Sequence, residues 1–163
     1  MPETQVSTVS FSEFGTTPMS DEQFVAAVNA TMAPGLQLLN AVCEWASGDR
    51  GEVVISFELD DRFVNVAGFI CGGFLAHILD QTATCAATLV TGQAAPSVEF
   101  KTNFIAAARP GRFTAKGSVV RAGKSIAFTE AKMWDAETKL IATAAVTSQL
   151  VAAARLVEKA VSG

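Results

Sequence analysis

The stretch from Asn65 to Thr88 constrains the fold more than any other part of the 163-residue chain. It contains the pair Gly72-Gly73, followed by a helix-like run that passes through Asp80 and Thr84. Successive helical residues turn by about 100°, so residues three and four apart share a side of the helix. One side carries Leu75, Ile78, Leu79, Thr82, Ala86 and Leu89. We expect this side to pack against a β-sheet.

The opposite side of the same helix carries the short or uncharged polar residues His77, Gln81, Thr84 and Thr88 together with Asp80. A helix face that is open to solvent normally carries Lys, Glu or Arg, and this face carries none of them. We therefore interpret the face as covered, either by a ligand or by a second subunit. Asp80 is then either an active-site carboxylate or a hydrogen-bonded carboxylate of a subunit interface.

The glycine pair gives the start of this helix a chemical interpretation. The first N–H groups of a helix lack intrahelical acceptors and carry partial positive charge, and glycine lets a ligand oxygen approach them closely. Such groups can stabilise an oxyanion, although close helix packing explains a Gly-Gly pair about as often. The combination of the pair with a carboxylate eight residues after Gly72 favours an active site more strongly than either part alone.

Strand-like segments lie on both sides of the helix. Residues 36–45 and 52–59 are predicted to form a hairpin, and residues 97–105, 113–121, 126–134 and 140–150 a four-stranded meander. The alternation of Phe100, Thr102 and Phe104 is typical of an antiparallel strand with one buried face. One apolar helix between a hairpin and a meander predicts an α+β architecture, in which a curved antiparallel sheet of five to six strands wraps around one long central helix.

The length of the chain fits one domain with a substantial core. We divide it into an N-terminal arm and short helix (1–35), a main domain (36–151) and a C-terminal tail (152–163), which we expect to be helical and peripheral. Ser20-Asp-Glu-Gln23 is a capping box, which predicts a helix from Asp21 to about Met32 that Pro34-Gly35 ends.

Composition excludes several classes of function. Apolar residues make up 50% of the chain and charged residues 17%, which leaves few charges for the surface of a monomer and predicts a buried subunit interface. The net charge of −4 and the absence of a Lys/Arg cluster argue against nucleic-acid binding. Residues 64–79 form the most apolar stretch, but Asn65 and His77 make it a poor membrane span, so we expect no membrane association.

The cysteines are Cys43, Cys71 and Cys85, an odd number without metal-type spacing. Because His77 is the only histidine, we expect no zinc site and no cofactor. The start of the chain lacks the basic segment and apolar run of a signal peptide. Together these features predict a reduced, cytoplasmic protein.

The residues around the helix resemble the hotdog-fold acyl-CoA thioesterases of the phenylacetyl-CoA and 4-hydroxybenzoyl-CoA type. The family pattern is Asn-x-x-Gly-x-x-His-Gly-Gly with an acidic residue eight positions after the first glycine of the pair. The matching residues here are Asn65, Gly68, Cys71-Gly72-Gly73 and Asp80. Further matches are Ser97-Val-Glu-Phe, Asn103-Phe104, Arg109-Pro-Gly111, Arg121-Ala-Gly-Lys124-Ser125 and Lys139-Leu-Ile-Ala-Thr. The resemblance implies a hotdog fold and hydrolysis of an acyl-CoA thioester at a site shared by two subunits.

The resemblance also implies a role for each matching residue. The N–H of Gly72 would polarise the thioester carbonyl, and Asp80 of a partner subunit would be the general base or the nucleophile. Asn65 would position the carbonyl or the attacking water. Thr84 and Ser97 would hold the water or orient the carboxylate.

The phosphates of CoA favour basic residues at the mouth of a pocket. The resemblance implies contacts with CoA from Gly73, Arg109, Arg112, Arg121, Gly123, Lys124 and Ser125. Ala106-Ala107 stands where the family frequently has Arg-Pro, which removes one phosphate contact. We expect Phe63, Phe69 and Phe74 to line an acyl tunnel for aromatic or medium-chain acids. The expected assembly is a homodimer, further paired into a tetramer.

Cys71 departs from the family pattern, which has His at that position. It is interpreted as a small buried side chain, a modified supporting residue or a thiol nucleophile. His77 lies one turn before Asp80 and could contact Asp80, face a partner subunit or be structural. Because of Cys71, the alternative function is a non-catalytic acyl-CoA or acyl-lipid binding protein on the same fold. A hotdog dehydratase is a third hypothesis, but His77 alone does not supply its histidine pattern.

Overall fold

The computed structural model describes residues 19–152; the predicted arm before residue 19 and the predicted tail after residue 152 lie outside the described residues. The elements in chain order are α1 (Asp21–Ala30), α2 (Pro34–Leu38), β1 (Val42–Ser47), β2 (Glu52–Leu59), the 3-10 helix η2 (Asp61–Phe63), α3 (Gly72–Thr91), β3 (Ser97–Phe104), β4 (Gly111–Ala122), β5 (Ile126–Asp135) and β6 (Leu140–Gln149). The strands form one antiparallel six-stranded sheet in the order β1-β2-β4-β5-β6-β3.

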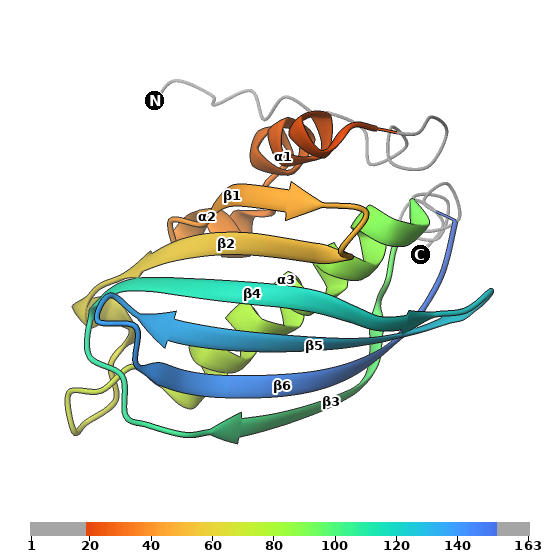
Figure 1. Ribbon diagram of the computed structural model, residues 1–163. Coiled ribbons are helices and arrows are strands. Elements are labelled where there is room, and N and C mark those ends of the chain that lie inside the picture. Colours follow the sequence, from red (N-terminus) through yellow and green to blue (C-terminus); the bar gives the residue numbers. More distant parts are fainter. Residues whose placement is uncertain (1–18, 153–163) are drawn as a thin grey trace, which may run out of the picture.

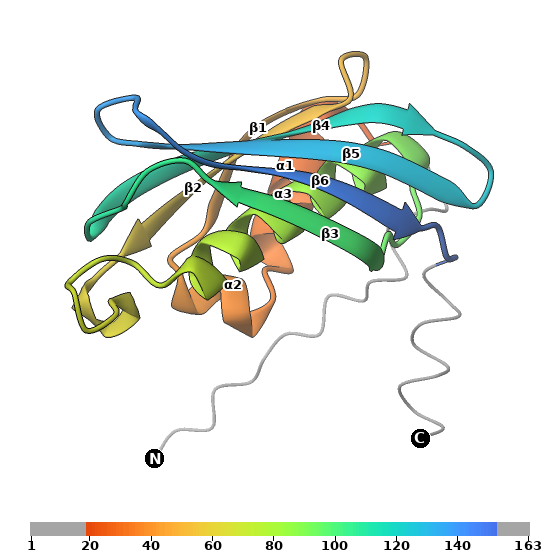
Figure 2. The same cartoon turned by 90° about the horizontal axis from the view of Figure 1, so that it is seen from below.

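The sheet curves around α3, which is the predicted hotdog arrangement (Figure 1). Figure 2 shows α3 lying along one side of the sheet, with α1 and α2 on that same side. Among residues 19–152, no helix has both the length and the apolar character needed to cross a membrane.

Two predictions about the strands were wrong. Residues 36–45 do not form one strand, because Pro34 starts the short helix α2 and β1 begins only at Val42. Proline fits the first turn of a helix, where its missing N–H is not needed, so Pro34-Gly35 opens a helix instead of ending α1. The four later strands do not form a simple meander either, because β3 pairs with β6 at the edge of the sheet and the chain crosses over to β4.

The predicted capping box at the start of α1 is present. The Ser20 hydroxyl accepts the N–H of Gln23 at 3.2 Å, and the Gln23 side chain accepts the N–H of Ser20 at 2.9 Å. Two N–H groups that the first turn of a helix would leave without acceptors are therefore satisfied. This reciprocal cap fixes the start of α1 within one residue of the prediction.

Helix α3 packs its predicted side against the sheet. The residues Leu75, Ile78, Leu79, Thr82 and Ala86 are buried, as are Ala83 and Ala87, while Leu89 is half-buried. The closest approach is at Gly117 of β4, where a Cβ atom would lie 2.3 Å from the carbonyl oxygen of Thr82. Because glycine has no Cβ, the helix backbone can lie directly on the strand.

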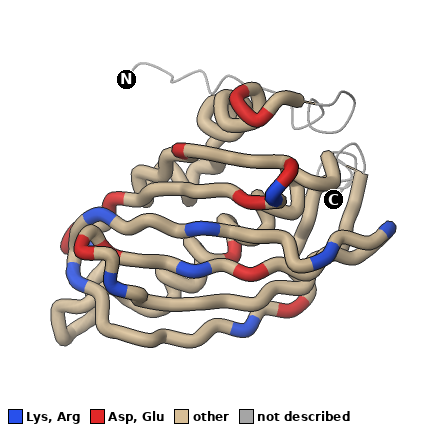
Figure 3. Tube along the Cα trace, viewed as in Figure 1, with Lys and Arg blue, Asp and Glu red and all other residues tan. Residues whose placement is uncertain are grey.

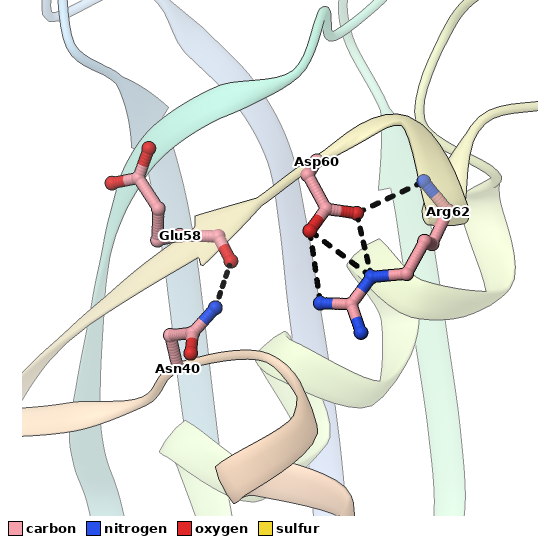
Figure 4. A network of polar contacts seen from close by, with 4 residues as sticks. All are labelled: Asn40, Glu58, Asp60 and Arg62. Carbon is pink, nitrogen blue, oxygen red and sulfur yellow. Dashed lines mark hydrogen bonds and ion pairs between the residues drawn. The ribbon is translucent and has the colours of Figure 1, made fainter.

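A polar network fixes the turn that leaves β2 (Figure 4). The Asp60 carboxylate accepts the backbone N–H of Arg62 at 2.9 Å and its guanidinium at 2.8 to 3.0 Å, and so caps η2. The Asn40 side chain donates to the carbonyl oxygen of Glu58 at 3.0 Å. These contacts direct the chain from β2 into the loop that precedes α3.

Candidate active site

Asn65 organises the loop before α3. Its Oδ1 accepts the N–H of Ala67 at 2.9 Å and the N–H of Phe69 at 3.3 Å. Gly68 closes the turn with a φ of 77°, a left-handed conformation that glycine adopts without steric cost. The loop is joined to the rest of the fold by the N–H of Ile70, which donates to the carbonyl of Ala108 at 2.8 Å. The Oδ1 of Asn65 is thus engaged in holding the loop.

Helix α3 begins at Gly72, with Cys71 as its N-cap. The carbonyl of Cys71 accepts the N–H of Phe74 at 3.0 Å, but the Cys71 side chain makes no capping hydrogen bond. Within residues 19–152, the first N–H groups of the helix therefore receive no capping side chain from Cys71. A Cβ at Gly72 would lie 3.0 Å from the ring of Phe104, whereas a Cβ at Gly73 would meet no described atom within 4 Å. Packing within the chain thus explains the glycine at 72 but not the one at 73.

Asp80 and Ser97, which are 17 residues apart in sequence, meet in the structure. The Ser97 hydroxyl donates to Oδ1 of Asp80 at 2.5 Å, the length expected for an O–H group on a carboxylate. Ser97 is the first residue of β3, so the start of that strand orients a side chain from the middle of α3. The carboxylate is half-buried at this point.

Thr84 and His77 do not contact the carboxylate of Asp80. The Thr84 hydroxyl donates to the backbone carbonyls of Asp80 at 3.0 Å and Gln81 at 3.2 Å. This is a common contact for a helical threonine, and it engages the hydroxyl proton with the backbone. His77 lies toward α2, with its Nε2 3.5 Å from the position that a Cβ on Gly35 would take. In the described part of the chain, no hydrogen bond joins His77 to Asp80.

Asp80 and Ser97 lie at a pocket of about 290 Å³ between α3 and the N-terminal helices. Its walls are formed by Phe24, Val28, Thr31, Met32, Ala33, Leu36, Ile55, Gln81, Thr84, Cys85, Thr88, Ala94, Ala95 and Pro96. A mainly apolar lining with a few polar groups is typical of sites for small organic ligands. The sequence prediction missed α1 and α2 as walls of this pocket, because their residues carry no chemically distinctive group.

The three aromatic residues expected in an acyl tunnel do not line this pocket. The rings of Phe63 and Phe74 pack against each other edge to face, with centroids 5.0 Å apart. Phe69 lies beneath the guanidinium of Arg109, whose central carbon is 5.1 Å from the ring centroid. All three belong to the region around the start of α3, whereas the pocket starts at Asp80, two turns farther along.

Cys71 is half-buried and lines a second cavity, of about 510 Å³, together with Gly73, Phe74, His77 and residues of α2. It therefore does not fill the core as a fully buried side chain would. Burial raises the pKa of the Cys43 thiol to about 11, and burial also raises the pKa of Cys85 well above its usual range.

Apart from Gly73 on α3, the residues predicted to contact CoA lie in two separate groups. Arg109 and Arg112 lie at the start of β4, and Arg121 to Ser125 lie at its end and in the following turn. A 12-residue strand is roughly 40 Å long, and positive residues appear at both ends of the sheet in Figure 3. Arg112 also pairs with Glu44 at 2.8 Å.

Comparison with known proteins identifies the family. A profile of the Thioesterase superfamily matches residues 67–142. A candidate esterase of Saccharolobus solfataricus is 32% identical over 98 residues, which cover 59% of this chain and 69% of the relative. The chain belongs to the Thioesterase superfamily. This membership confirms the resemblance predicted from the sequence, and it supports thioester hydrolysis as the class of reaction.

Solved structures of other proteins share the fold at low identity. A candidate thioesterase related to phenylacetic acid degradation from Ralstonia eutropha is 21% identical, with a TM-score of 0.71 over 77% of this chain and 98% of that chain. A Streptococcus mutans protein bound to acetyl-CoA is 21% identical, with a TM-score of 0.61 over 66% of this chain and 86% of that chain. The superfamily match of residues 67–142 includes Gly72, Asp80 and Ser97.

Proposed function

We propose that this protein hydrolyses an acyl-CoA thioester to the free acid and CoA. The observation that carries the proposal is the Asp80 carboxylate, oriented by Ser97 at a largely apolar pocket. A carboxylate in such a place can take a proton from water or attack a carbonyl carbon itself, and neither step requires a metal. The acetyl-CoA bound to the Streptococcus mutans relative supports a CoA thioester as the substrate.

A second copy of the chain completes the proposed site. Gly72 and Asp80 lie on one helix eight residues apart, which separates them by roughly 12 Å along its axis. One thioester carbonyl cannot contact both groups of the same chain. β3 is an edge strand that exposes Val98 and Phe104, by 60% and 53%, so its free edge and apolar surface suit pairing between copies. We therefore propose a dimer as the active unit and a pair of dimers as the assembly.

In this dimer the two halves of the site act on opposite faces of the thioester. The N–H of Gly72 donates to the carbonyl oxygen and stabilises the negative charge that develops there, and Asn65 holds the adjoining loop. From the other copy, Asp80 either takes a proton from the attacking water or forms a bond to the carbonyl carbon. The carbon–sulfur bond then breaks, and CoA leaves as a thiolate that is protonated. If water attacked, the free acid is released directly. If Asp80 attacked, the acyl group remains on its carboxylate as a mixed anhydride, which a water molecule hydrolyses to release the acid and restore Asp80. Ser97 positions the carboxylate for either step.

The nucleotide end of CoA is assigned to the turn after β4. Ser97 pairs with Ser148 in the sheet, and Ser148 pairs with Ala127, two residues after that turn. Two strand spacings place Ala127 about 10 Å from the start of β3, and the turn lies just beyond it. Arg121 and Lys124 are then the nearer of the two basic groups to Asp80. Their replacement by alanine should raise KM for an acyl-CoA but not for an acyl-pantetheine thioester, which lacks the nucleotide.

The direct test measures release of free thiol from a panel of aromatic and aliphatic acyl-CoA thioesters. Wild-type protein should cleave at least one of them, and Asp80→Asn should lose about 10²- to 10⁴-fold in rate, since the amide cannot act as a base. Equal rates for the two proteins would refute the role of Asp80. Tight binding of every thioester without turnover would refute hydrolysis and select the non-catalytic acyl-CoA binding protein instead.

A mixing experiment tests the shared site. Gly72→Pro removes the N–H at the first helical position, where proline fits the helix backbone and the exposed ring of Phe104 has to move by a few tenths of an ångström. Asp80→Asn removes the base. Each variant alone should be inactive, but unfolding and refolding them together creates mixed dimers with one intact site. About a quarter of the wild-type activity should return, because half of the dimers are mixed and each has one site of two. No recovery in verified mixed dimers would place the whole site within one chain.

A further inference from the structure

The wall opposite α3 decides how much room the pocket offers to an acyl group. We propose that α1 is the wall that limits the length of the acyl group, and that Asn29 is the positioning residue that holds this wall in place. The inference rests on the proposed function, because it assumes that the pocket beside Asp80 receives the acyl part of the thioester.

The pocket extends away from the carboxylate along α3. The residues of α3 that line it run from Asp80 to Thr88, a distance of roughly 12 Å along the helix axis. Phe24 of α1 also lines the pocket, and it packs in a cluster with Ala86, six residues beyond Asp80. Phe24 therefore lies toward the end of the pocket that is remote from the carboxylate. An acyl chain that starts at Asp80 and grows along α3 meets the Phe24 ring.

The volume of the pocket sets a size class. A water molecule occupies about 30 Å³ in the liquid, so a space of about 290 Å³ holds roughly ten atoms of that size. Val28 lies one turn after Phe24 and lines the same pocket from α1. The space between these two side chains and α3 therefore suits a medium-length or single-ring acyl group.

Two side chains attach α1 to the edge of the sheet. The Nδ2 of Asn29 donates to the carbonyl of Cys43 at 2.9 Å, and its Oδ1 accepts the N–H of Cys43 at 2.8 Å. At the other end of the helix, Asp21 accepts the N–H of Gly48 at 2.8 Å. Asn29 therefore satisfies both backbone groups of one residue on the edge strand β1, as a neighbouring strand would.

These attachments matter for the pocket because its two long walls are held differently. Helix α3 lies directly on β4 at Gly117, where its backbone is in contact with the sheet. Helix α1 has 10 residues; the hydrogen bonds of Asn29 tie it to β1, and that of Asp21 ties it to Gly48 in the turn that follows β1. Asn29 directly follows Val28 in the helix, so the double hydrogen bond fixes the turn that carries a pocket-lining residue. Loosening this bond lets the α1 wall move away from α3.

The first experiment changes the wall directly. The ratio kcat/KM is measured for straight-chain acyl-CoA thioesters of increasing length with wild type, Phe24→Ala and Val28→Phe. Each further methylene that becomes buried contributes about fourfold, so Phe24→Ala should favour a chain longer by two methylenes by about 15-fold over wild type. Val28→Phe fills space and should shift the optimum to shorter chains, which tests the wall even if Phe24→Ala folds poorly.

The second experiment tests Asn29 as a positioning residue. Asn29→Ala should widen the length profile toward longer chains by severalfold while the rate for the shortest substrate stays near that of wild type. Gln23→Ala is the matched control, because it weakens the cap of α1 without touching β1 or the pocket. Its length profile should equal that of wild type. A purely structural role for Asn29 would lower the rates for all chain lengths by the same factor.

The outcomes separate this inference from the proposed function. In one outcome the wild type cleaves thioesters while Phe24→Ala, Val28→Phe and Asn29→Ala each change kcat/KM by the same factor for every chain length. In that case the inference is overturned and the proposed function stands. If the wild type cleaves none, the function fails, and calorimetric titration with free carboxylic acids of increasing length still tests the wall. If the variants shift the length of the acid that binds most tightly, the inference about the wall is supported. If the preferred length is the same in all of them, the inference is overturned.

Discussion

Replacing Gly117 by alanine should separate α3 from β4. The added Cβ would lie 2.3 Å from the carbonyl oxygen of Thr82, 2.8 Å from its carbonyl carbon and 3.3 Å from the Cα of Ala83. Non-bonded carbon atoms are in favourable contact at about 3.5 to 4.0 Å, so the helix must move by about 1 Å. The obstructing atoms belong to the backbone, and no change of rotamer can relieve the overlap.

The expected loss of stability lies at the upper end of the range for overpacked cores. Such changes cost about 1 to 3 kcal/mol, and here a buried helix has to shift as a whole, so we expect about 3 kcal/mol. For a protein of this size, each kcal/mol lowers Tm by about 2 to 4 °C, which gives a decrease of about 6 to 12 °C. Thermal denaturation followed by circular dichroism measures this directly. Gly73→Ala is the matched control, because its Cβ meets no described atom within 4 Å, and its Tm should change by less than about 2 °C.

The same displacement reaches the candidate active site. Asp80 lies two residues before Thr82 on α3, and its hydrogen bond to Ser97 is only 2.5 Å long. A helix shift of about 1 Å would stretch or break this contact, since hydrogen bonds weaken quickly beyond their normal length. Hydrolysis by Gly117→Ala should therefore be slower even at temperatures where the variant is folded. A variant with the Tm and the rate of wild type would refute the close approach of α3 and β4.

Three further predictions concern single side chains. Ser97→Ala should slow CoA release by about 10- to 100-fold, because a hydrogen bond to a charged group contributes about 1.5 to 3 kcal/mol, and Ser97→Thr should restore most of the rate; equal rates for Ser97→Ala and wild type would exclude the positioning role. The hydroxyl of Ser148 is buried without a hydrogen-bond partner among residues 19–152, so Ser148→Ala should keep or raise Tm, and a clear decrease would contradict this. Alkylation near pH 8 should label Cys71 before Cys43 and Cys85, because the raised pKa of the latter two keeps them protonated until the pH approaches 11 or more; mass spectrometry that finds either labelled first would contradict the assignment.

Local sequence signals predicted the elements whose cause is local. The capping box at Ser20 fixed the start of α1, and the apolar run of Glu52–Leu59, preceded by turn residues, forms β2 with the predicted bounds. The helical periodicity after Gly72-Gly73 predicted α3 and the side that it buries. In each case the signal and the structure occupy the same few residues, so no distant contact was needed to decide between alternatives.

The errors arose where distant parts of the chain decide the outcome. The apolar run of residues 36–45 is compatible with either a strand or a helical turn. Pro34 favours a helical turn at its start, and the prediction overlooked this. The pairing of β3 with β6 joins residues 38 to 51 positions apart, and alternation along a strand does not reveal its neighbour. The contribution of Phe24 and Asn29 to the candidate site depends on contacts with α3 and β1, which the sequence of α1 alone does not indicate.

The polar side of α3 was left with two interpretations, a ligand or a second subunit, and the proposed mechanism divides it between them. Asp80, Gln81 and Thr88 face the pocket beneath α1 within the same chain. Nearer the start of the helix, Gly73 and His77 line a different cavity beside α2. In the proposed mechanism the N–H groups at the start of α3 act together with a carboxylate from another copy. The first half of the polar face therefore suits contact with a partner subunit, and the second half suits contact with a ligand. Changes at His77 should therefore alter assembly before they alter the choice of acyl group, and changes at Thr88 should do the reverse.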